Sequence, residues 1–520
     1  MDHSDPVRDM APVNKFGAEE LERIHDVSLT LLRELGVKVD YEPALDLLAE
    51  NGCTVDRDDK MVTFPSDLVE WAIETAPASF TLHGRNPERN VTVGEGEYAT
   101  SPAGSAPNVL TYEDGRRPST LEDFETFIKL TQMSDLMTTT GYNHAEPNDV
   151  DQEIKHYRLM ERIIKHSDKP LKGDTWGADR ARASIEMAGI ANDDPDLSKP
   201  YIFATINSVS PRTWDTKMTG GLMEYAKAGQ VGILSPAVMA AASGPATLAG
   251  TLALGNAEIL AGNVIAQLVN EGAPIIYGLP TSNVDIRYGS FSIGSPEGAL
   301  CVAFTGQMGR FYDVPTRAGG GLTDSKMPDM QAGAESMLQL YTTIQSGVNL
   351  IHHAAGMLDS YSTSSPEKFL IDLDVIRYIE RFRDGLDVSE ETLAQDLIAE
   401  VEPGGHFLNK RHTFEHSKTE FLIPELFYRN SYEQPGKTKE RKARSNWPTI
   451  AKSSCWRSTN GHRSTPTSRP NSTNTSKQES KRHCHLRKLS DTLVKRHHDA
   501  TRSYFCDAVV FFGQSACVLR

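Results

Sequence analysis

Residues 318–335 read AGGGLTDSKMPDMQAGAE, and residues 312–316 before them read YDVPT. Residues 312–316 predict a short strand. The three glycines predict a tight loop, and the residues from Met330 onward predict a helix. A strand that ends in a polar, glycine-rich loop before a helix is typical of sites in α/β enzymes. Glycine lets a ligand approach the backbone, and a helix start offers free N–H groups to an anion. A tight turn with solvated charges would have the same local sequence, so the segments on either side decide the interpretation.

From Thr120 to Gly356, helix-like and strand-like segments alternate about seven times, in units of roughly 30 to 45 residues. Strands are expected within 137–143, 170–176, 201–211, 231–238, 273–282, 314–321 and 348–356. This alternation predicts an α/β protein with a parallel sheet, and the number of units favours a closed (β/α)8 TIM barrel over an open sheet. The eighth strand is expected either from 98–104 or from the residues after Phe369.

Polar and aromatic residues follow nearly every predicted strand. Because the active site of such a barrel lies at the carboxyl ends of its strands, these residues are expected to meet in one site. Each residue alone could equally be a helix cap, a packed aromatic or a hydrogen-bonded core histidine. The set includes Tyr142, Asn143, Asp174, Trp176, Asn207, Ser235, Tyr277, Gly320, Gly321, Asp324, His352 and His353.

Charge and cysteine content divide the chain near residue 435. The last 86 residues carry about 18 Lys and Arg against about 5 Asp and Glu, so the preceding body has a net charge near -29 although the whole chain is at -16. A body this acidic argues against nucleic acid or an anionic membrane as its partner. The body has only two isolated cysteines, Cys53 and Cys301, and the N-terminus lacks the pattern of a secretory signal. We therefore expect a cytoplasmic protein.

Three regions are predicted from these patterns. Residues 1–118 mix short helices with turn-rich strands and are expected to form an N-terminal α+β cap. Residues 119–434 are expected to form the barrel. Residues 435–520 are basic and rich in Ser and Arg, which predicts either a disordered arm or the product of a shifted reading frame. His412 and His416 are four residues apart but lack the glutamate of a metalloprotease helix, so no metal site is expected there.

Several segments in order resemble the trimethylamine methyltransferase family, in particular its members that demethylate quaternary amines such as glycine betaine. They are 318–335, the loop SSPEK at 364–368 followed by Ile371 and Asp372, EPGGHFL at 402–408 followed by HT at 412–413, and NSVSP at 207–211. The likeness covers roughly 15–434. The chain departs from the family in two respects: it contains no pyrrolysine, which the trimethylamine-specific members carry in the barrel, and it has a different sequence after Gln434.

The resemblance implies a (β/α)8 barrel that moves a methyl group from a methylated amine to the Co(I) of a corrinoid. That corrinoid would be carried by a small partner protein, and the chain itself would hold no tightly bound cofactor. The setting would be one-carbon metabolism, which includes methanogenesis, and a homo-oligomer is expected. Because pyrrolysine is absent, a quaternary amine of the betaine type is the expected methyl donor rather than trimethylamine.

A quaternary ammonium group has no N–H to donate, so aromatic faces are expected to hold it. Tyr142, Trp176 and Tyr277 suit that role, while Asn143, Asn207, His352 and the backbone of Gly320 and Gly321 could bind the rest of the substrate. His353, Asp324 and Lys326 are the candidate catalytic residues. Since a neutral tertiary amine leaves without a proton, Asp324 and Lys326 could instead shape the loop, as is expected of Asp329, Gln331 and Glu335. Two other hypotheses remain: a TIM-barrel enzyme for a small anionic substrate, with the glycines binding phosphate, and an inactive binding protein.

Overall fold

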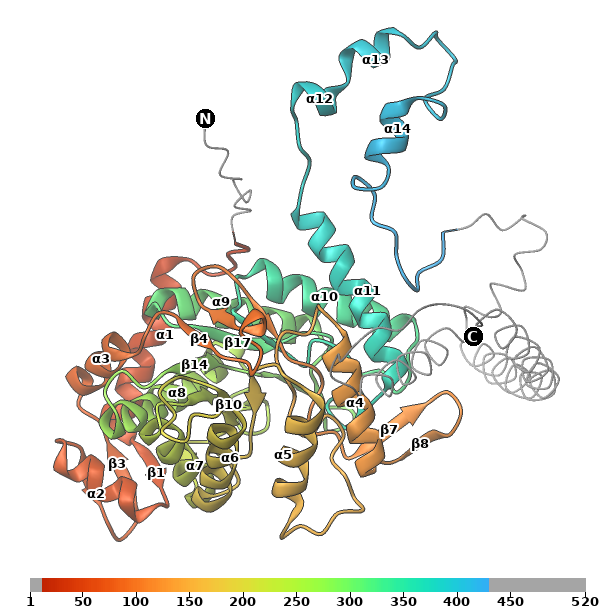
Figure 1. Ribbon diagram of the computed structural model, residues 1–520. Helices are drawn as coiled ribbons and strands as arrows, with labels where there is room; N and C mark the ends of the chain where they lie inside the picture. The colour runs from red at the N-terminus through yellow and green to blue at the C-terminus, as the bar shows by residue number, and fades with distance from the viewer. Residues whose placement is uncertain (1–11, 430–520) are drawn as a thin grey trace, which may run out of the picture. The chain divides into compact units, whose positions relative to one another are not determined.

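A parallel sheet forms the centre of the computed structural model, which describes residues 12–429 (Figure 1). Its seven strands follow the order β6-β18-β17-β14-β12-β10-β9, and every neighbouring pair is parallel. They are β6 (Ala99–Thr100), β9 (Leu171–Lys172), β10 (Ile202–Ile206), β12 (Val231–Leu234), β14 (Ile275–Gly278), β17 (Thr316–Gly319) and β18 (Leu350–His352). The parallel sheet confirms the predicted α/β barrel, and β6 comes from 98–104, one of the two sources expected for the eighth strand.

Residues 138–140 close the barrel between β6 and β9 without forming a regular strand. The N–H groups of Thr138 and Thr139 donate to the carbonyl of Thr100, and the N–H of Thr140 donates to the carbonyl of Pro170. Hydroxyl groups supply further bonds, because Thr138 Oγ1 accepts from the N–H of Thr100 and Thr140 Oγ1 accepts from the N–H of Lys172. The segment expected as the first barrel strand therefore occupies that place, with side-chain bonds replacing part of the ladder.

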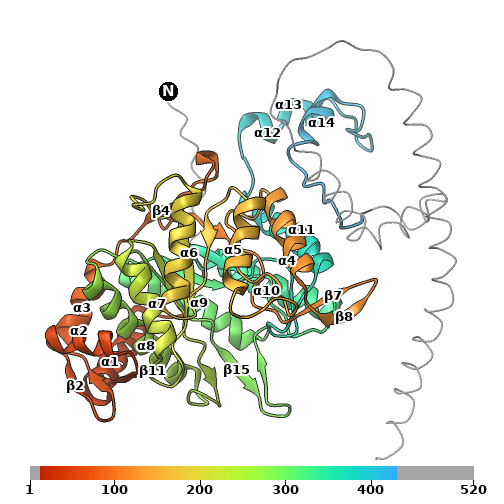
Figure 2. The same ribbon diagram turned by 60° about the horizontal axis from the view of Figure 1, so that its bottom comes forward.

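Helices connect the strands around the outside of the barrel (Figures 1 and 2). They are α4 (Leu121–Met133), α5 (Lys155–His166), α6 (Ala178–Ala191), α7 (Thr216–Lys227), α8 (Leu248–Val269), α9 (Pro296–Tyr312), α10 (Met330–Gln345) and α11 (Pro366–Arg383). Side-chain caps fix where several begin: Thr120, Ser295, Asp329 and Ser365 each accept a hydrogen bond from an N–H of the first turn.

α8 is a core helix. Among the described residues it is the one helix long and apolar enough to cross a membrane, and 89% of its most apolar window is buried within the fold. Its buried side chains pack against the N-terminal helices α1 (Ala18–Thr30) and α3 (Ser66–Thr75). This packing makes the N-terminal region part of one hydrophobic core with the barrel.

Small sheets surround the barrel. β1 (Val37–Val39), β2 (Thr54–Asp56) and β3 (Met61–Thr63) join β11 (Thr213–Trp214), next to α2 (Glu42–Glu50). The others are the β4–β5 pair (Phe80–Leu82, Val91–Val93), β13-β15-β16 (Met239–Ala240, Ser282–Asp285, Ser290–Ser292) and β19-β20-β7-β8 (Met357–Leu358, Thr363–Ser364, Asn108–Thr111, Gly115–Pro118). β7 and β8 pair as an antiparallel hairpin, which projects beside α4 in both ribbon views.

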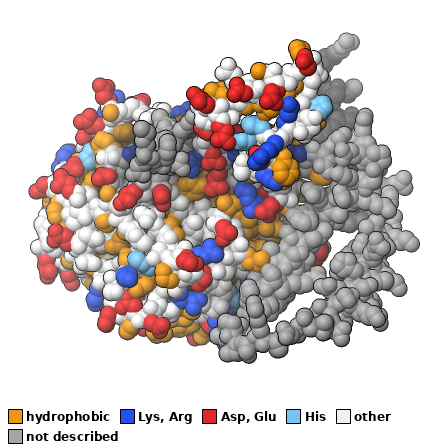
Figure 3. Space-filling model, turned by 45° about the horizontal axis from the view of Figure 1, so that its top comes forward, with side chains coloured by type: hydrophobic (Ala, Val, Ile, Leu, Met, Phe, Trp, Pro, Cys, Tyr) orange, Lys and Arg blue, Asp and Glu red, His pale blue; other side chains and the backbone are white. Residues whose placement is uncertain are grey.

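After α11 the chain forms three short helices, α12 (Glu390–Leu393), α13 (Gln395–Ala399) and α14 (Arg411–His416). It returns to α11 where the carboxylate of Asp374 accepts N–H groups from Glu425, Leu426 and Phe427. The predicted basic tail from 435 lies outside the described residues, and the boundaries predicted at 118 and 434 stay predictions. Acidic side chains are spread over the face shown in Figure 3, with apolar ones between them.

One predicted strand is displaced. Residues 312–316 were expected to be extended, but Tyr312 is the last residue of α9, and Asp313 ends the helix in the left-handed conformation with φ 53°. β17 begins at Thr316 and includes Gly319. The first of the three glycines is therefore a strand residue, and Arg317 lies inside the strand.

Candidate functional site

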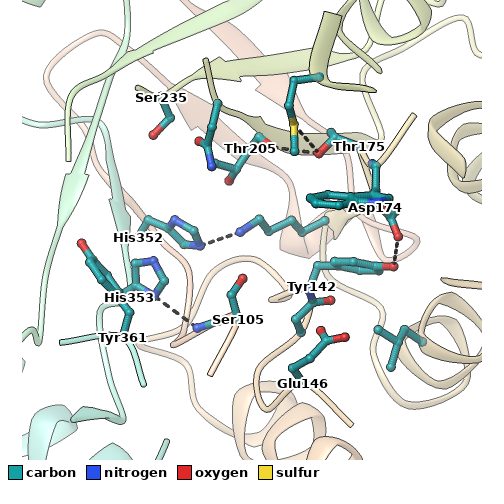
Figure 4. Close-up of a pocket in the computed structure, with 18 of the residues that line it drawn as sticks. Ser105, Tyr142, Glu146, Asp174, Thr175, Thr205, Ser235, His352, His353 and Tyr361 are labelled. Atoms are coloured by element: carbon teal, nitrogen blue, oxygen red, sulfur yellow. Dashed lines mark hydrogen bonds between the residues drawn. The ribbon is translucent and has the colours of Figure 1, made fainter. Parts of the chain in front are cut away.

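A pocket of about 730 Å³ lies at the carboxyl ends of the barrel strands (Figure 4). Nearly every strand or closing segment contributes to its lining: Gly104, Tyr142, Asn143, Asp174, Trp176, Thr205, Asn207, Ser235, Arg317, His352 and His353. Six of the residues predicted to bind or act on a substrate are in this lining: Tyr142, Asn143, Trp176, Asn207, His352 and His353. Their roles stay predictions, but their convergence shows how the closed barrel brings distant residues together.

His352 on β18 lies between two basic side chains, one from the neighbouring strand β17 and one from β9. Its Nδ1 is 2.7 Å from Nη2 of Arg317, and its Nε2 is 2.6 Å from Nζ of Lys172. All three side chains are buried, and burial is the first cause that lowers the pKa of each of them. Among the described residues, neither Arg317 nor Lys172 forms an ion pair with a carboxylate. This end of the pocket therefore carries positive charge that an anion could neutralise.

His353 is held beside His352, with the two ring centroids 4.0 Å apart. Its Nδ1 accepts the N–H of Gly104 at 3.2 Å, and the ring of Tyr361 lies 4.9 Å away. The residue has a left-handed backbone, with φ 56°, a conformation that non-glycine residues adopt rarely. Burial lowers the pKa of His353 well below its ordinary value. The backbone and ring contacts together fix a neutral imidazole in the lining.

The opposite side of the pocket combines an aromatic ring with carboxylates. The hydroxyl of Tyr142 donates to Oδ2 of Asp174 at 2.7 Å, and Oδ1 of Asp174 accepts the N–H of Trp176. Glu146 forms an ion pair of 2.7 Å with Lys155. In Figure 4, Tyr142, Asp174 and Glu146 lie on one side of the pocket, and His352 and His353 lie on the other. The pocket thus has an acidic, aromatic side and a basic side.

Trp176 is at the rim, because its side chain is 52% exposed and Nζ of Lys217 lies 4.2 Å from the ring centroid. Several polar atoms of the lining are buried without a hydrogen-bond partner in the part of the chain that the structure describes. They are Asn143 Oδ1, Thr205 Oγ1, Arg317 Nε and the hydroxyl of Tyr361. Buried polar atoms are ordinarily hydrogen-bonded, so this cluster is typical of a site that a polar ligand completes.

Five of the residues predicted to bind or act on a substrate lie outside the pocket. Tyr277 was expected to hold the ammonium group in the pocket, but the structure places it elsewhere. Its ring is buried between β14 and α8, where its hydroxyl donates to Oδ1 of Asn256 at 2.9 Å. The strand presents this side chain to the helices rather than to the barrel interior. An aromatic residue at a strand end looks the same in the sequence whichever face of the strand it occupies.

Gly320 and Gly321 were expected to bind the substrate through their backbone, and their contacts differ from that expectation. Their N–H groups donate to the carbonyls of His352 and His353, so they are not available to a ligand. A Cβ at Gly320 would lie 2.7 Å from Cγ2 of Ile351, which explains the need for glycine in this close packing. The glycine loop therefore supports the two histidines from behind and does not line the pocket.

The charged residues of the same loop stabilise it. Asp324 accepts the N–H groups of Ile293 and Gly294 and the hydroxyl of Ser360, outside the pocket. Lys326 is exposed and pairs with Asp359 at 3.2 Å. The catalytic role considered for Asp324 and Lys326 does not fit these positions, and the loop-shaping interpretation does.

The three residues expected to shape the loop make contacts of that kind. Asp329 caps α10 and accepts the hydroxyl of Ser325. Glu335 accepts the hydroxyl of Thr323 and the N–H of Asp324, and Gln331 donates to its other oxygen.

The sequence interpretation missed Lys172, Arg317 and Tyr361. A signal for the first two exists, because each is a long basic residue inside a short strand whose neighbours are buried. A buried strand rarely contains an unpaired cation, so such a position indicates a functional side chain. Gly278 on β14 leaves space for one of them, since a Cβ there would lie 3.2 Å from Cδ of Arg317.

The two described cysteines are not part of the site. Cys53 and Cys301 are buried elsewhere, and burial raises the pKa of each thiol to about 12. Each therefore stays a neutral thiol rather than a nucleophilic thiolate at physiological pH.

The family model for trimethylamine methyltransferase (MTTB) matches residues 2–453. The chain belongs to the trimethylamine methyltransferase family. It is 41% identical over 442 residues to a glycine betaine methyltransferase of Desulfitobacterium hafniense (strain Y51), covering 84% of this chain and 92% of the relative. It is 31% identical to a proline betaine:corrinoid methyltransferase of Eubacterium limosum, covering 79% of this chain and 86% of the relative. Membership makes the chain a methyltransferase.

The fold also resembles that of a solved structure. The crystal structure of the hydroxylamine MtmB complex matches with a TM-score of 0.51 at 12% identity, over 73% of this chain and 77% of that one. At this identity the likeness concerns the fold, and it agrees with the barrel described above.

Proposed function

We propose that the protein transfers a methyl group from a quaternary amine that also carries a carboxylate, a betaine, to the corrinoid of a partner protein. Methyl transfer from methylated amines follows from family membership and from the betaine and corrinoid methyltransferases among the relatives. The observation that carries the choice of substrate is the two-sided pocket. Arg317, Lys172 and His352 complement a carboxylate, and Tyr142 with Asp174 complements a cationic nitrogen.

The acidic side suits a quaternary ammonium group. Such a group binds aromatic faces and diffuse negative charge, with roughly 0.5–2 kcal/mol for each good ring contact. The bond from the Tyr142 hydroxyl fixes the ring and leaves the negative charge of Asp174 close to it. Both groups act without needing a proton from the ligand, which a quaternary nitrogen cannot supply.

The basic side suits a carboxylate. Arg317 and Lys172 are buried without an acidic partner in the described chain, so an entering carboxylate would neutralise the charge of Arg317, which is otherwise costly to bury. Trimethylamine has no such group. A betaine therefore fits both sides, whereas a simple amine fits one.

The Co(I) corrinoid supplies the nucleophile that accepts the methyl group. The pocket fits an external acceptor, because neither described cysteine lines it and Trp176 leaves its rim open to solvent. The chain's own residues hold the substrate, exclude water from its buried end and orient one N–CH3 bond toward the mouth. The product is a neutral tertiary amine, so no side chain has to donate a proton. His353 serves in this proposal by holding the substrate's position.

An anionic substrate such as a sugar phosphate is less well supported. The N–H groups of Gly320 and Gly321 are already bonded within the protein, and Asp174 and Glu146 would repel a second anionic group. The partner is expected to be a small corrinoid protein in the cytoplasm, where Co(I) can be kept reduced.

The test is methylation of free cob(I)alamin by the purified full-length chain, followed through the loss of the Co(I) absorbance. Glycine betaine, tetramethylammonium and trimethylamine are compared as donors at equal concentration. We expect betaine to be the best of the three by at least about tenfold in kcat/KM. Trimethylamine as the preferred donor, or no transfer from any of them, would contradict the proposal.

A further inference from the structure

Three side chains, from the neighbouring strands β17 and β18 and from β9, form one hydrogen-bonded chain in which only one arrangement of hydrogens is consistent. Arg317 stays protonated and can only donate, so Nδ1 of His352 accepts from it at 2.7 Å. A neutral imidazole then carries its hydrogen on Nε2. That atom is 2.6 Å from Nζ of Lys172 and donates to it. The nitrogen of Lys172 must offer a lone pair, which only the neutral amine has.

The surroundings of Lys172 agree with a neutral amine. The charged and titratable groups that face it are Arg317 on β17, His352 on β18, His353 directly after β18, and His144 after the closing segment. All are basic, and none of the described carboxylates pairs with Lys172. Burial first, and the charge of Arg317 second, lower the pKa of Lys172 well below its ordinary value.

We propose that Lys172 takes up one proton from solvent when a carboxylate enters the basic side of the pocket, so that the acid group is recognised together with a proton. This inference rests on the proposed function for the identity of the ligand. The step is a proton transfer alone: a buffer acid or hydronium ion in the solvent gives up a proton, which forms an N–H bond with the Nζ lone pair, and the resulting ammonium group donates to the carboxylate.

Protonation of Lys172 also frees the Nε2–H group of His352 from its hydrogen bond to Nζ. Once Lys172 is an ammonium group, it has no lone pair for Nε2–H, and that hydrogen is free to donate to the same carboxylate. Arg317 keeps its bond to Nδ1 and holds the ring in place. The site thus gains two donors for the acid group, whereas an amine without an acid leaves Lys172 neutral.

The experiment is isothermal titration calorimetry of the full-length chain with glycine betaine in buffers of different ionisation enthalpy at one pH near 8. The slope of observed enthalpy against buffer enthalpy counts the protons taken up. We expect close to one proton for betaine and close to none for tetramethylammonium. In the pH range where Lys172 is neutral in the free protein, Kd for betaine should rise about tenfold for each unit by which the pH is raised.

Two variants test whether Lys172 is the residue that takes up the proton. Lys172→Met should abolish the uptake by betaine, while Lys155→Met, which removes a pocket lysine already paired with Glu146, should retain it. A slope of zero with betaine that still binds and donates its methyl group would overturn this inference and leave the proposed function intact. Equal uptake with tetramethylammonium, or full uptake by Lys172→Met, would also overturn it. Betaine that neither binds nor donates a methyl group would remove the proposed function and this inference with it.

Discussion

The hydroxyl of Tyr142 donates a 2.7 Å hydrogen bond to Asp174, which joins the segment that closes the barrel to the loop after β9. This bond sets the ring of Tyr142 in the pocket lining and keeps a carboxylate beside it. The two residues define the side of the pocket assigned to the ammonium group.

The ring of Tyr142 should matter more than its hydroxyl. Tyr142→Leu removes the aromatic face, and the loss of roughly 0.5–2 kcal/mol should raise KM for betaine about 2- to 30-fold. Tyr142→Phe retains the face and should have a smaller effect. Steady-state kinetics with cob(I)alamin measure both variants, and equal effects would count against an aromatic contact with the cation.

Arg317→Lys should impair the enzyme although it keeps the charge. Lysine cannot present the fixed fork that places Nη2 on Nδ1 of His352, and a charge-assisted bond of this kind contributes about 1.5–3 kcal/mol. We expect kcat/KM for betaine to fall roughly 10- to 100-fold. The matched control is Arg287→Lys, at an exposed arginine paired with Asp285; it should stay within about twofold. A similar loss in both variants would contradict a role specific to Arg317.

The stability of the protein should depend on pH through Lys172. Its pKa in the folded state is lowered, so between that value and about 10.4 the unfolded chain binds more protons at this lysine. The contribution of this group to the free energy of unfolding therefore increases as the pH rises through this window. At pH values below the window, Lys172 is charged in the folded protein and its burial destabilises the fold by the full amount. Lys172→Met should raise Tm most at the low-pH end and flatten the pH dependence. Differential scanning calorimetry from about pH 6 to pH 9 tests this, and an unchanged slope would contradict it.

Gly320→Ala should lower stability more than it affects substrate binding. The added Cβ would lie 2.7 Å from Cγ2 of Ile351 and 2.8 Å from Cα of Ala354, and overpacking of this kind costs about 1–3 kcal/mol. The control Gly333→Ala is on the exposed face of α10 with nothing within 4 Å, and it should be neutral or stabilising. Thermal unfolding and KM for betaine separate the two effects. A large rise in KM without loss of Tm would contradict this prediction and indicate that Gly320 contributes to substrate binding.

The sequence was sufficient for the order of the elements and for much of the pocket. The alternation of helices and strands predicted the barrel, and the rule that strand ends converge brought Tyr142, Asn207 and His352 together correctly. The positions that failed depended on which face of a strand a residue occupies. A shift of one residue reverses that face, so Tyr277 was expected in the pocket and is in the outer core.

The same uncertainty concealed the basic side of the pocket. With β17 expected to start at residue 314, Arg317 looked like part of the approach to the glycine loop, and its inward position depended on the strand beginning at Thr316. Lys172 became significant only when β9 and β18 placed it against His352. These contacts join residues far apart in the chain, and local patterns carry no information about them.

The closing segment 138–140 has a consequence for how the barrel moves. Hydroxyl groups of Thr100, Thr138 and Thr140 replace part of the regular backbone ladder there, and Tyr142 lies two residues beyond Thr140. Side-chain hydroxyls exchange partners with water more readily than a continuous ladder does, so this seam is where local opening should cost least. Protection of its amides against hydrogen exchange should therefore increase first when a ligand spans the pocket from Tyr142 to His352.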